Sequence, residues 1–253
     1  MIEAFPISFT DGDTATAVRV DERGQLPAAL AALGLGSPRP TVVVIGGAGG
    51  LDAADVERLR CLFAEAIVPV IDDHHAAGVD GGTAAGVMQL FGETRAAAGA
   101  GFPLIGVAAE GTVHLPAQRT SGEEADLDSH HSHFILVPGH HWGDESPWIA
   151  AAATTLAADA PTVTVLINGG KIALHDVEAS IAAGRQVIVM KGSGRAADAL
   201  AAALAGTPTD PRAAALATRG GMRTLPDDDP ARLAAALAEI LASPHQGDTV
   251  ETA

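Results

Sequence analysis

The chain contains very little cysteine and few basic residues. A single cysteine, Cys61, cannot form an internal disulfide, which is typical of proteins in a reducing compartment. Cys61 falls in the apolar pattern of an expected helix, so we expect it in the core rather than at a reactive site. Fifteen Lys and Arg residues against 31 Asp and Glu residues give a formal net charge of −16. This charge argues against binding to nucleic acid or to an anionic membrane, and an anionic ligand would need local donors.

The sequence also lacks a long hydrophobic run. No stretch reaches the ~18 apolar residues of a membrane-spanning helix. The first residues, 1–5, lack the basic region and apolar core of a signal peptide. We therefore expect a cytoplasmic protein. Hydrophobic residues make up 47% of the 253 positions, enough for the core of one large α/β domain.

Short apolar runs alternate with helical patterns along most of the chain. The expected strands are 41–45, 68–71, 103–108, 133–137, 162–167 and 186–190, and the interleaved helices are 52–66, 83–98, 146–158, 172–183 and 195–205. Such alternation implies right-handed crossovers between parallel strands. The pattern predicts an α/β fold with a doubly wound, mostly parallel sheet and helices on both faces.

Three segments are expected on this basis. Residues 1–38 form an N-terminal β-hairpin extension, whose turn is signalled by Asp11-Gly12-Asp13. Residues 39–205 form the main domain. Residues 206–253 add a loop, a last helix near 230–242 and a polar tail that we expect to fray, all packing on the same domain.

Glycine collects at the carboxyl ends of the expected strands. Ligands of open α/β sheets bind at that edge, so we expect these loops to line a site. The candidate ligand-binding residues are Gly46, Gly47, Ala48 and Gly49; Gly81, Gly82, Thr83 and Gly86; Gly139, His140 and Gly143; Asn168, Gly169 and Gly170; and Gly192, Ser193, Gly194 and Arg195.

The last of these loops has the pattern of a phosphate cradle. An apolar strand stops in Gly192-Ser193-Gly194-Arg195 and restarts as an alanine-rich helix. Backbone N–H groups, the positive end of the helix dipole and a two-pronged guanidinium all favour an anion there. The alternative is an ordinary turn with a solvent-facing arginine. Ser193 lacks the G-x-S-x-G setting of a catalytic serine.

Two further patterns bear on a cofactor or metal. The first glycine loop starts like a dinucleotide fingerprint, but Asp52 stands where its third glycine belongs, which argues against an NAD-dependent dehydrogenase. Paired histidines, including His74-His75 and His140-His141, fall in the edge loops, but their spacing matches no standard metal motif. We expect no resident metal or cofactor. His133 begins a strand and is expected to be a hydrogen-bonded structural residue.

Four segments together resemble the SLOG superfamily, and most closely its prokaryotic branch related to the cytosolic N-terminal domain of TRPM channels (LSDAT type). They are Gly81–Met88, Leu127–Val137, Ile167–Gly170 and Gly192–Asp198, and the resemblance runs from about residue 40 to about 205. It implies a Rossmann-like fold that binds nucleotide-derived ligands, including ADP-ribose and its cyclic relatives in some channel members. By this resemblance, the loop at 192–195 would take the phosphates and the loop at 81–86 would line the nucleotide.

The superfamily also contains LOG-like phosphoribohydrolases, whose catalytic loop reads P-G-G-x-G-T-x-x-E. The segment Pro138–Pro147 is a partial match, with an extra residue between the glycines, Asp144 in place of the threonine and proline where the glutamate is expected. Glu145, with Asp144, is the candidate for the carboxylate that stabilises an oxocarbenium-like centre.

The sequence therefore leads to one main hypothesis and two alternatives. The main one is a cytoplasmic nucleotide-binding sensor domain for ADP-ribose, cyclic ADP-ribose, NAD or a related ligand. The first alternative is an N-glycosidic hydrolase of a nucleotide or NAD-type substrate, and the second is a metal-dependent hydrolase using the edge histidines. A small-molecule nucleotide is the expected partner, without nucleic acid or membrane, and a homodimer is the default assembly.

Overall fold

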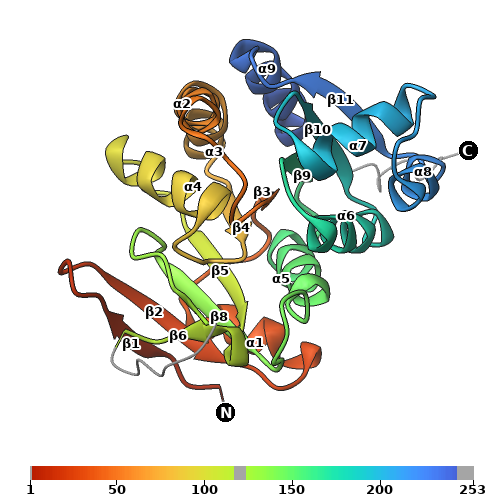
Figure 1. The fold of residues 1–253 in the computed structure, drawn as a ribbon. Coiled ribbons are helices and arrows are strands. Elements are labelled where there is room, and N and C mark those ends of the chain that lie inside the picture. Colours follow the sequence, from red (N-terminus) through yellow and green to blue (C-terminus); the bar gives the residue numbers. More distant parts are fainter. Residues whose placement is uncertain (1, 117–123, 244–253) are drawn as a thin grey trace, which may run out of the picture.

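The computed structural model describes residues 2–116 and 124–243. Its main strands are β1 (Phe5–Ser8), β2 (Thr14–Arg19), β3 (Thr41–Gly46), β4 (Ala77–Asp80), β5 (Leu104–Ala109), β8 (His133–Val137), β9 (Thr162–Ile167), β10 (Gln186–Lys191) and β11 (Met222–Pro226). Within the described part they form one nine-stranded sheet in the order β1-β2-β8-β5-β4-β3-β9-β10-β11 (Figure 1). Only β1 and β2 pair antiparallel in this sheet. The predicted α/β, mostly parallel sheet is confirmed. Two two-residue strands, β6 (Val113–His114) and β7 (Ala125–Asp126), pair separately.

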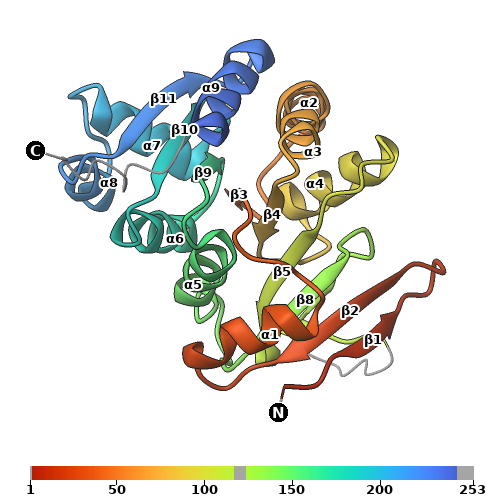
Figure 2. The ribbon, with the colours of Figure 1, turned by 180° about the vertical axis from the view of Figure 1, so that it is seen from behind.

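Helices cover both faces of the sheet. One face carries α1 (Leu26–Ala32), α5 (Ser146–Ala157), α6 (Lys171–Ala182), α7 (Arg195–Leu204) and α8 (Pro211–Ala217). The other carries α2 (Ala53–Leu62), α3 (Val68–Asp73), α4 (Gly86–Ala97) and α9 (Pro230–Ala242). Figures 1 and 2 show α1, α5 and α6 on the opposite side of the sheet from α2, α4 and α9. Short 3-10 turns occupy Arg23–Gln25 and Glu110–Thr112.

The central strands explain why there are two layers of helices. Side chains of a strand alternate between its faces, so a strand buried on both faces reads as a continuous apolar run. In β3, Val43 and Ile45 join the core on one face while Val42 and Val44 join the core on the other. The sequence pattern of residues 41–45 therefore predicted both the strand and its double burial.

The strand predicted at residues 68–71 is wrong. These residues belong to α3, which continues α2 through a π-helical turn at Phe63–Ile67. Val68, Val70 and Ile71 are buried on that helix in the core that α9 and α4 share. The strand that enters the sheet instead is β4, whose four residues Ala-Gly-Val-Asp are too short and too small to show a strand pattern. A Cβ on Gly78 would lie 2.7 Å from the ring of Phe91, so β4 needs this glycine.

The ends of the chain extend the same sheet. The predicted N-terminal hairpin is present, and β2 pairs in parallel with β8. At the other edge, β11 pairs with β10, a strand that the sequence pattern did not reveal, and α9 lies where a helix was expected at 230–242. The predicted polar tail at 244–253 lies outside the described residues. Cys61 is exposed on α2, contrary to the expected core position.

No helix in residues 2–116 and 124–243 combines the length and the apolar character that crossing a bilayer requires.

The chain reverses its direction across the sheet between β3 and β9. From β3 it adds β4, β5 and β8 in turn on one side, and then α5 carries it back so that β9 pairs with the other side of β3. Helices that follow β3 and β9 therefore leave on opposite faces, and the space between their starts is not filled by a crossover. Such a reversal is where open α/β sheets bind ligands.

A buried ionic cluster holds the end of β4. His131 is fully buried and contacts two carboxylates, with its Nε2 2.8 Å from Asp80 Oδ1 and its Nδ1 2.7 Å from Asp128 Oδ2. The N–H of Gly82 donates to the same Asp80 oxygen at 2.7 Å. Burial alone would lower the pKa of His131, but the two carboxylates outweigh it and raise the pKa to about 9. The imidazolium therefore ties the loop after β4 to the segment before β8.

Because the pKa of His131 is raised above its reference value of about 6.5, the cluster stabilises the fold fully below pH 6.5 and loses this contribution as pH rises through 9. The shift corresponds to a loss on the order of 3 kcal/mol. Urea unfolding between pH 6 and 9.5 should show the decline. Imidazole NMR should show His131 still charged at pH 8, with its resonance assigned by its absence in His131→Gln.

Asp128→Asn is the control, because removing one carboxylate should lower the pKa of His131. A His131 resonance that titrates at or below pH 6.5 in the unmodified protein would contradict the assignment of a charged imidazole.

Candidate functional site

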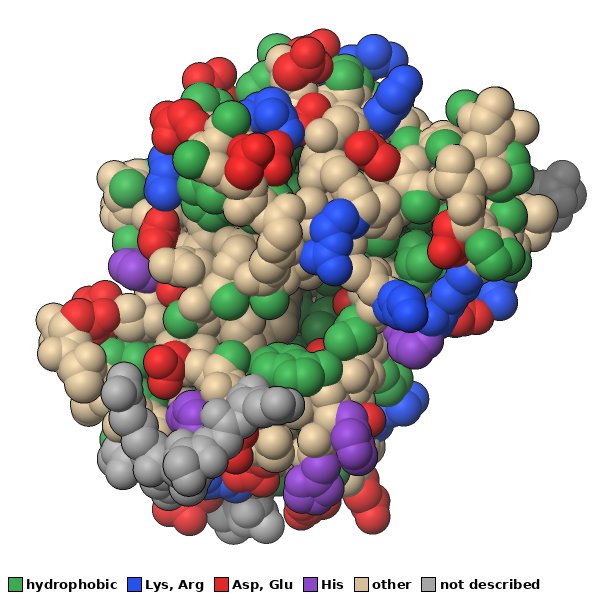
Figure 3. Space-filling view, in the orientation of Figure 1, with side chains coloured by type: hydrophobic (Ala, Val, Ile, Leu, Met, Phe, Trp, Pro, Cys, Tyr) green, Lys and Arg blue, Asp and Glu red, His purple; other side chains and the backbone are tan. Residues whose placement is uncertain are grey.

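A cavity of about 810 Å³ opens at the carboxyl edge of the sheet, where the chain reverses between β3 and β9. Figure 3 shows a hollow in the middle of this face, with hydrophobic side chains in and below it and basic side chains nearby. Small-molecule sites have volumes of roughly 300–1,000 Å³. The cavity is therefore the candidate ligand site.

Several of the residues predicted from the sequence line this cavity. They are Gly46, Gly47, Ala48, Gly49, Gly81, Thr83, Glu145, Gly170 and Arg195. The structure does not place the remaining predicted residues on the lining: Gly82, Gly86, Gly139, His140, Gly143, Asp144, Asn168, Gly169, Gly192, Ser193 and Gly194. Lining residues that the sequence did not single out include Met88, Trp142, Ile149, Lys171, Ile172 and Asp176.

Two glycines of the 81–86 loop serve chain packing beneath the cavity. Gly82 has a φ of +70°, and a Cβ on it would lie 2.7 Å from the Cα of Gly106. Gly86 has a φ of +54°, and a Cβ there would lie 2.9 Å from the Cα of Ala48. These positions need glycine because two backbones approach each other. Neither glycine lines the cavity.

Asn168 and Ser193 join two edge loops to each other. The Asn168 N–H donates to Ser193 Oγ at 2.8 Å, its Nδ2 donates to the Ser193 carbonyl at 2.7 Å, and Ser193 Oγ donates to the Met190 carbonyl at 2.6 Å. Both residues are 2% exposed. Because each polar group of this pair already has a protein partner, Asn168 and Ser193 position the loops rather than face a ligand.

The start of α7 is partly occupied in the same way. The N–H groups of its second and third residues donate to protein carbonyls, Ala196 to Gly169 at 3.1 Å and Ala197 to Asn168 at 3.0 Å. The N–H of Gly192 donates to the Asp198 carboxylate at 2.6 Å. Part of the cradle expected at residues 192–195 is therefore taken up by the protein itself, and Arg195 is the residue of this loop that lines the cavity.

The start of α6 is open instead. The N–H groups of Gly170, Lys171 and Ile172 have no acceptor in the described part of the chain, and no side chain caps this helix. All three residues line the cavity. Unsatisfied N–H groups and the positive end of the helix dipole favour an anion at this position.

Arg195 reaches this open helix start from the neighbouring loop. Its Nη1 donates to the Gly49 carbonyl at 2.8 Å, and its guanidinium lies beside Gly50 and Gly170, within 3.2 Å of a Cβ placed on either. Lys171 adds a second cation on the lining. The cavity therefore has one basic end, assembled from three loops.

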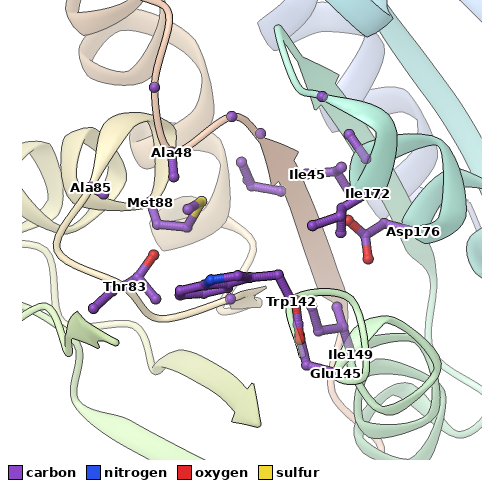
Figure 4. Close-up of a pocket in the computed structure, with 18 of the residues that line it drawn as sticks. Ile45, Ala48, Thr83, Ala85, Met88, Trp142, Glu145, Ile149, Ile172 and Asp176 are labelled. Atoms are coloured by element: carbon purple, nitrogen blue, oxygen red, sulfur yellow. The ribbon is translucent and has the colours of Figure 1, made fainter. Parts of the chain in front are cut away.

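The opposite end of the cavity is apolar and contains an aromatic ring. Trp142 is 45% exposed and extends across the opening toward Thr83, with Met88 above it (Figure 4). The hydroxyl of Thr83 is buried without a hydrogen-bond partner in the described structure. Ile45, Ile172 and Asp176 lie on the other side in the same view.

Two carboxyl groups, those of Glu145 and Asp176, line the cavity. Burial raises the pKa of Asp176 to about 7, with the nearby Glu145 adding to the effect. The Ser146 hydroxyl acts in the opposite direction, because its hydrogen bond to Asp176 lowers the pKa. Burial also raises the pKa of Glu145. The Gly143 N–H, which donates to both Glu145 oxygens at 2.9 and 3.0 Å, lowers this pKa but does not offset the burial. Raised pKa values of two carboxyl groups in one cavity are typical of functional sites.

Asp144 does not belong to this pair. Its carboxylate accepts the N–H groups of His140 and His141 at 2.9 and 3.0 Å, and these bonds hold the pKa of Asp144 below its usual range. A Cβ on Gly139 would lie 2.6 Å from the Asp144 Cβ. Asp144 thus shapes the loop that presents Trp142, and the second cavity carboxyl is Asp176.

Among residues 2–116 and 124–243, no three His, Cys, Asp or Glu side chains are grouped so as to hold a metal ion. The Nδ1 of His133 lies 2.8 Å from the Ser132 hydroxyl, as expected for a structural residue, and burial lowers its pKa.

The missed residues left faint signals in the sequence. Asp176 falls three residues after Ala173 and one before Val177, both buried, so an acid lies on the inward face of a predicted helix. Trp142 is a large aromatic in a loop otherwise rich in polar residues and glycine. Neither signal identifies the neighbouring side chain in space. Glu145 is far from Asp176 in the chain, and Thr83 is far from Trp142.

Comparison with known proteins identifies a family. The profile of the family described as "SLOG in TRPM, prokaryote" matches residues 39–243. The chain is 31% identical over 204 residues to transient receptor potential cation channel subfamily M member 2 of Rattus norvegicus, and 32% over 208 residues to that of Mus musculus. Each match covers 66% of this chain but 13% of the channel subunit. An X-ray structure from a structural genomics consortium is similar with a TM-score of 0.43 and 21% identity, over 63% of this chain and 78% of that one.

The loop-joining role of Ser193 predicts a stability defect. Ser193→Ala removes the acceptor of the buried Asn168 N–H, and an unsatisfied buried donor costs about 1–3 kcal/mol of unfolding free energy. Urea denaturation measures the loss. Thr218→Ala, which removes an exposed hydroxyl bonded to the Ala215 carbonyl, is the matched control and should change stability by less than about 0.5 kcal/mol. Equal stability of the two variants would argue that Ser193 does not join the loops.

Proposed function

Because this chain belongs to the family described as SLOG in TRPM, prokaryote, we propose that it is a nucleotide-binding domain whose ligand is ADP-ribose, cyclic ADP-ribose, NAD or a related nucleotide-derived molecule. The observation that carries the proposal is the open start of α6 facing Arg195 inside the cavity. The family resemblance at the sequence level points to the same class of ligand.

The basic end suits a phosphate group. The protein carries a net charge of −16, so a phosphate is repelled by the molecule as a whole and must be held by local groups. Backbone N–H groups at Gly170–Ile172 donate along the helix axis, and the Arg195 guanidinium supplies a planar fork for two phosphate oxygens. Lys171 adds charge without requiring a fixed geometry.

The middle of the cavity suits a sugar. Asp176 and Glu145 line the cavity, and the Glu145 carboxylate is held by Gly143. A ribose hydroxyl beside them would donate to a carboxyl oxygen. The polar groups then follow the order of a nucleotide, with phosphate at α6 and ribose beside the two carboxyls.

A second candidate function, N-glycosidic hydrolysis, is favoured by the same carboxyl pair. Cleavage of the bond between base and ribose leaves an oxocarbenium-like carbon, takes a proton to the departing base and adds water to the sugar. Asp176, with a pKa of about 7, is a suitable proton donor at neutral pH. Glu145 would stabilise the developing positive charge and accept the proton of the attacking water.

Arg195→Ala should weaken binding of ADP-ribose by roughly 10- to 150-fold, the equivalent of about 1.5–3 kcal/mol for a charge-assisted hydrogen-bond pair. Calorimetric titration measures the change, and thermal shift provides a second readout. Adenosine, which lacks phosphate, should bind the variant and the unmodified protein alike. Arg60→Ala is the matched control, because Arg60 does not line the cavity and forms an ion pair with Glu93, with an N–O distance of 3.1 Å. Unchanged affinity for ADP-ribose in Arg195→Ala would sink the phosphate assignment.

If the chain is a hydrolase, Glu145→Gln and Asp176→Asn should each abolish release of the base from AMP, NAD or ADP-ribose. The rate at saturating substrate should fall as pH rises through about 7, because the acid form of Asp176 is then lost. Chromatography of the released base measures both effects. Full turnover in either variant would remove that carboxyl from the mechanism. Absence of base release by the unmodified protein would exclude hydrolysis of these substrates and leave the binding proposal standing.

A further inference from the structure

We propose that Arg185 is the centre of a second binding site, which takes a small inorganic anion of the size of chloride. The site lies between α5, α6 and the amino ends of β9 and β10. Arg185 directly precedes β10, so it lies at the edge of the sheet opposite the candidate ligand cavity, and it does not line that cavity. The inference therefore does not depend on the proposed function.

Arg185 is a buried cation without a carboxylate partner in the described part of the chain. The residue is 2% exposed, and its Nη2 donates to neutral acceptors, the Ala150 carbonyl at 2.7 Å and the Thr154 hydroxyl at 2.6 Å. Burial lowers the pKa of the guanidinium to about 10, so the group remains charged at neutral pH. A buried charge is costly unless an opposite charge accompanies it. The guanidinium therefore lacks the counter-charge that its burial requires.

Three polar atoms in this region have no hydrogen-bond partner among the described residues. Two are Nε and Nη1 of Arg185, and the third is Oγ1 of Thr162, the first residue of β9. The strand register pairs Gln186 with Val163, so Arg185 and Thr162 are neighbours at the amino ends of two strands that lie about 4.8 Å apart.

The side chains of Arg185 and Thr162 extend toward the same helices. Val187, two residues after Arg185, packs in the core that α5 and α6 share, and Thr164, two residues after Thr162, donates to the Ser180 hydroxyl of α6 at 3.0 Å. Side chains two residues apart along a strand point to the same face of the sheet. Figures 1 and 2 show α5 and α6 side by side on this face.

This set of atoms suits an anion better than it suits a cation or water. The guanidinium nitrogens only donate hydrogen bonds, and the Thr162 hydroxyl can also donate. A halide ion accepts from several donors and supplies the missing negative charge. A water molecule would supply no charge and would need acceptors for its own two hydrogens, whereas the nearby Ala150 carbonyl already accepts from Arg185 and from the Thr154 hydroxyl.

Burial also limits the size of the ion. At 2% exposure, the Arg185 side chain is not open to a nucleotide or to an organic anion, whereas a single-atom anion needs little space. The bound ion would hold Arg185 against α5 through Ala150 and Thr154. It would therefore stabilise the packing of α5 on the sheet.

The melting temperature in different salts tests the site. When sodium chloride replaces sodium isethionate at constant ionic strength, the melting temperature should rise, by roughly 3–6 °C once chloride is at about ten times its dissociation constant. Isethionate serves as the comparison because it is a larger, organic anion. The start of α6 also favours an anion, so the comparison is repeated with Arg195→Ala, in which the rise should persist.

Arg185→Met should abolish the rise, because it removes the charge and both free donors. The variant should fold, since the Ala150 carbonyl keeps its bond from the Thr154 hydroxyl. In isethionate it should melt no lower than the unmodified protein, because an uncompensated buried charge is gone. Arg219→Met is the matched control: it removes an exposed guanidinium paired with Glu178 and should keep the full rise.

The line width of the chloride NMR signal measures binding without unfolding the protein. The unmodified protein should broaden the signal, and bromide should reverse the broadening by competition. Arg185→Met should lose this broadening, and Thr162→Val should weaken chloride affinity several-fold. Arg185→Lys, which keeps the charge but loses the planar set of donors, should also bind chloride more weakly.

The outcomes decide the proposal in each case. A chloride response that is the same in Arg185→Met and in the unmodified protein overturns the site, whether both respond or neither does. If Arg185→Met does not fold, Arg185→Lys and Thr162→Val take its place, and unchanged chloride affinity in both overturns the site. Loss of the response in the Arg185 variants, with the full response in Arg219→Met, supports it. None of these results bears on nucleotide binding in the cavity.

Discussion

The site depends on the place where the chain turns back across its own sheet. Because β9 pairs with β3 after the chain has built β4, β5 and β8 on the other side, the helices that follow these two strands diverge onto opposite faces. Parallel alignment brings every strand-end loop to one edge, and the divergence leaves a cavity there that no crossover fills. The position of the cavity therefore follows from the strand order, whereas the side chains and N–H groups that line it come from the loops.

Hydrogen bonds among the loops decide which donors remain for a ligand. The carbonyls of Asn168 and Gly169 occupy the first N–H groups of α7, and Ser193 holds Asn168 in the conformation that makes this possible. The same loop then enters α6 with its N–H groups unsatisfied. The start of α7 thus helps to position the loop, and the start of α6 is left for an anion. In a protein with a net charge of −16, this local arrangement decides where a phosphate is stable.

Two titratable groups, the fully buried His131 and the half-buried Asp176, show how neighbouring charges shift a pKa. His131 lies between two carboxylates and stays charged, with a pKa of about 9, which fixes the loop that carries Thr83. Asp176 lies beside another carboxyl with no cation to offset burial, and its pKa rises to about 7. The first group is a structural charge below pH 9, while the second exchanges a proton near neutrality. Both effects arise from neighbours that are distant in the sequence.

The sequence by itself determined the fold class and indicated that a ligand site would lie at the carboxyl edge of the sheet. Continuous apolar runs such as 41–45, 133–137 and 162–167 predict buried strands because both of their faces are covered, and glycine-rich loops mark their carboxyl ends. This local reasoning failed at 68–71, where β-branched residues lie in a helix, and at β4, whose four small residues leave no pattern. Tertiary packing overrides local preference in both segments.

Only the tertiary structure decided which residues of the loops face the cavity. A glycine loop before a helix looks the same in sequence whether its N–H groups are open, as at Gly170, or filled by another loop, as at Ala196 and Ala197. The proximity of Glu145 to Asp176 likewise joins a residue just before α5 to one on α6. Hydrogen-bond satisfaction and burial are properties of neighbours in space, so a sequence names the candidates and the fold selects among them.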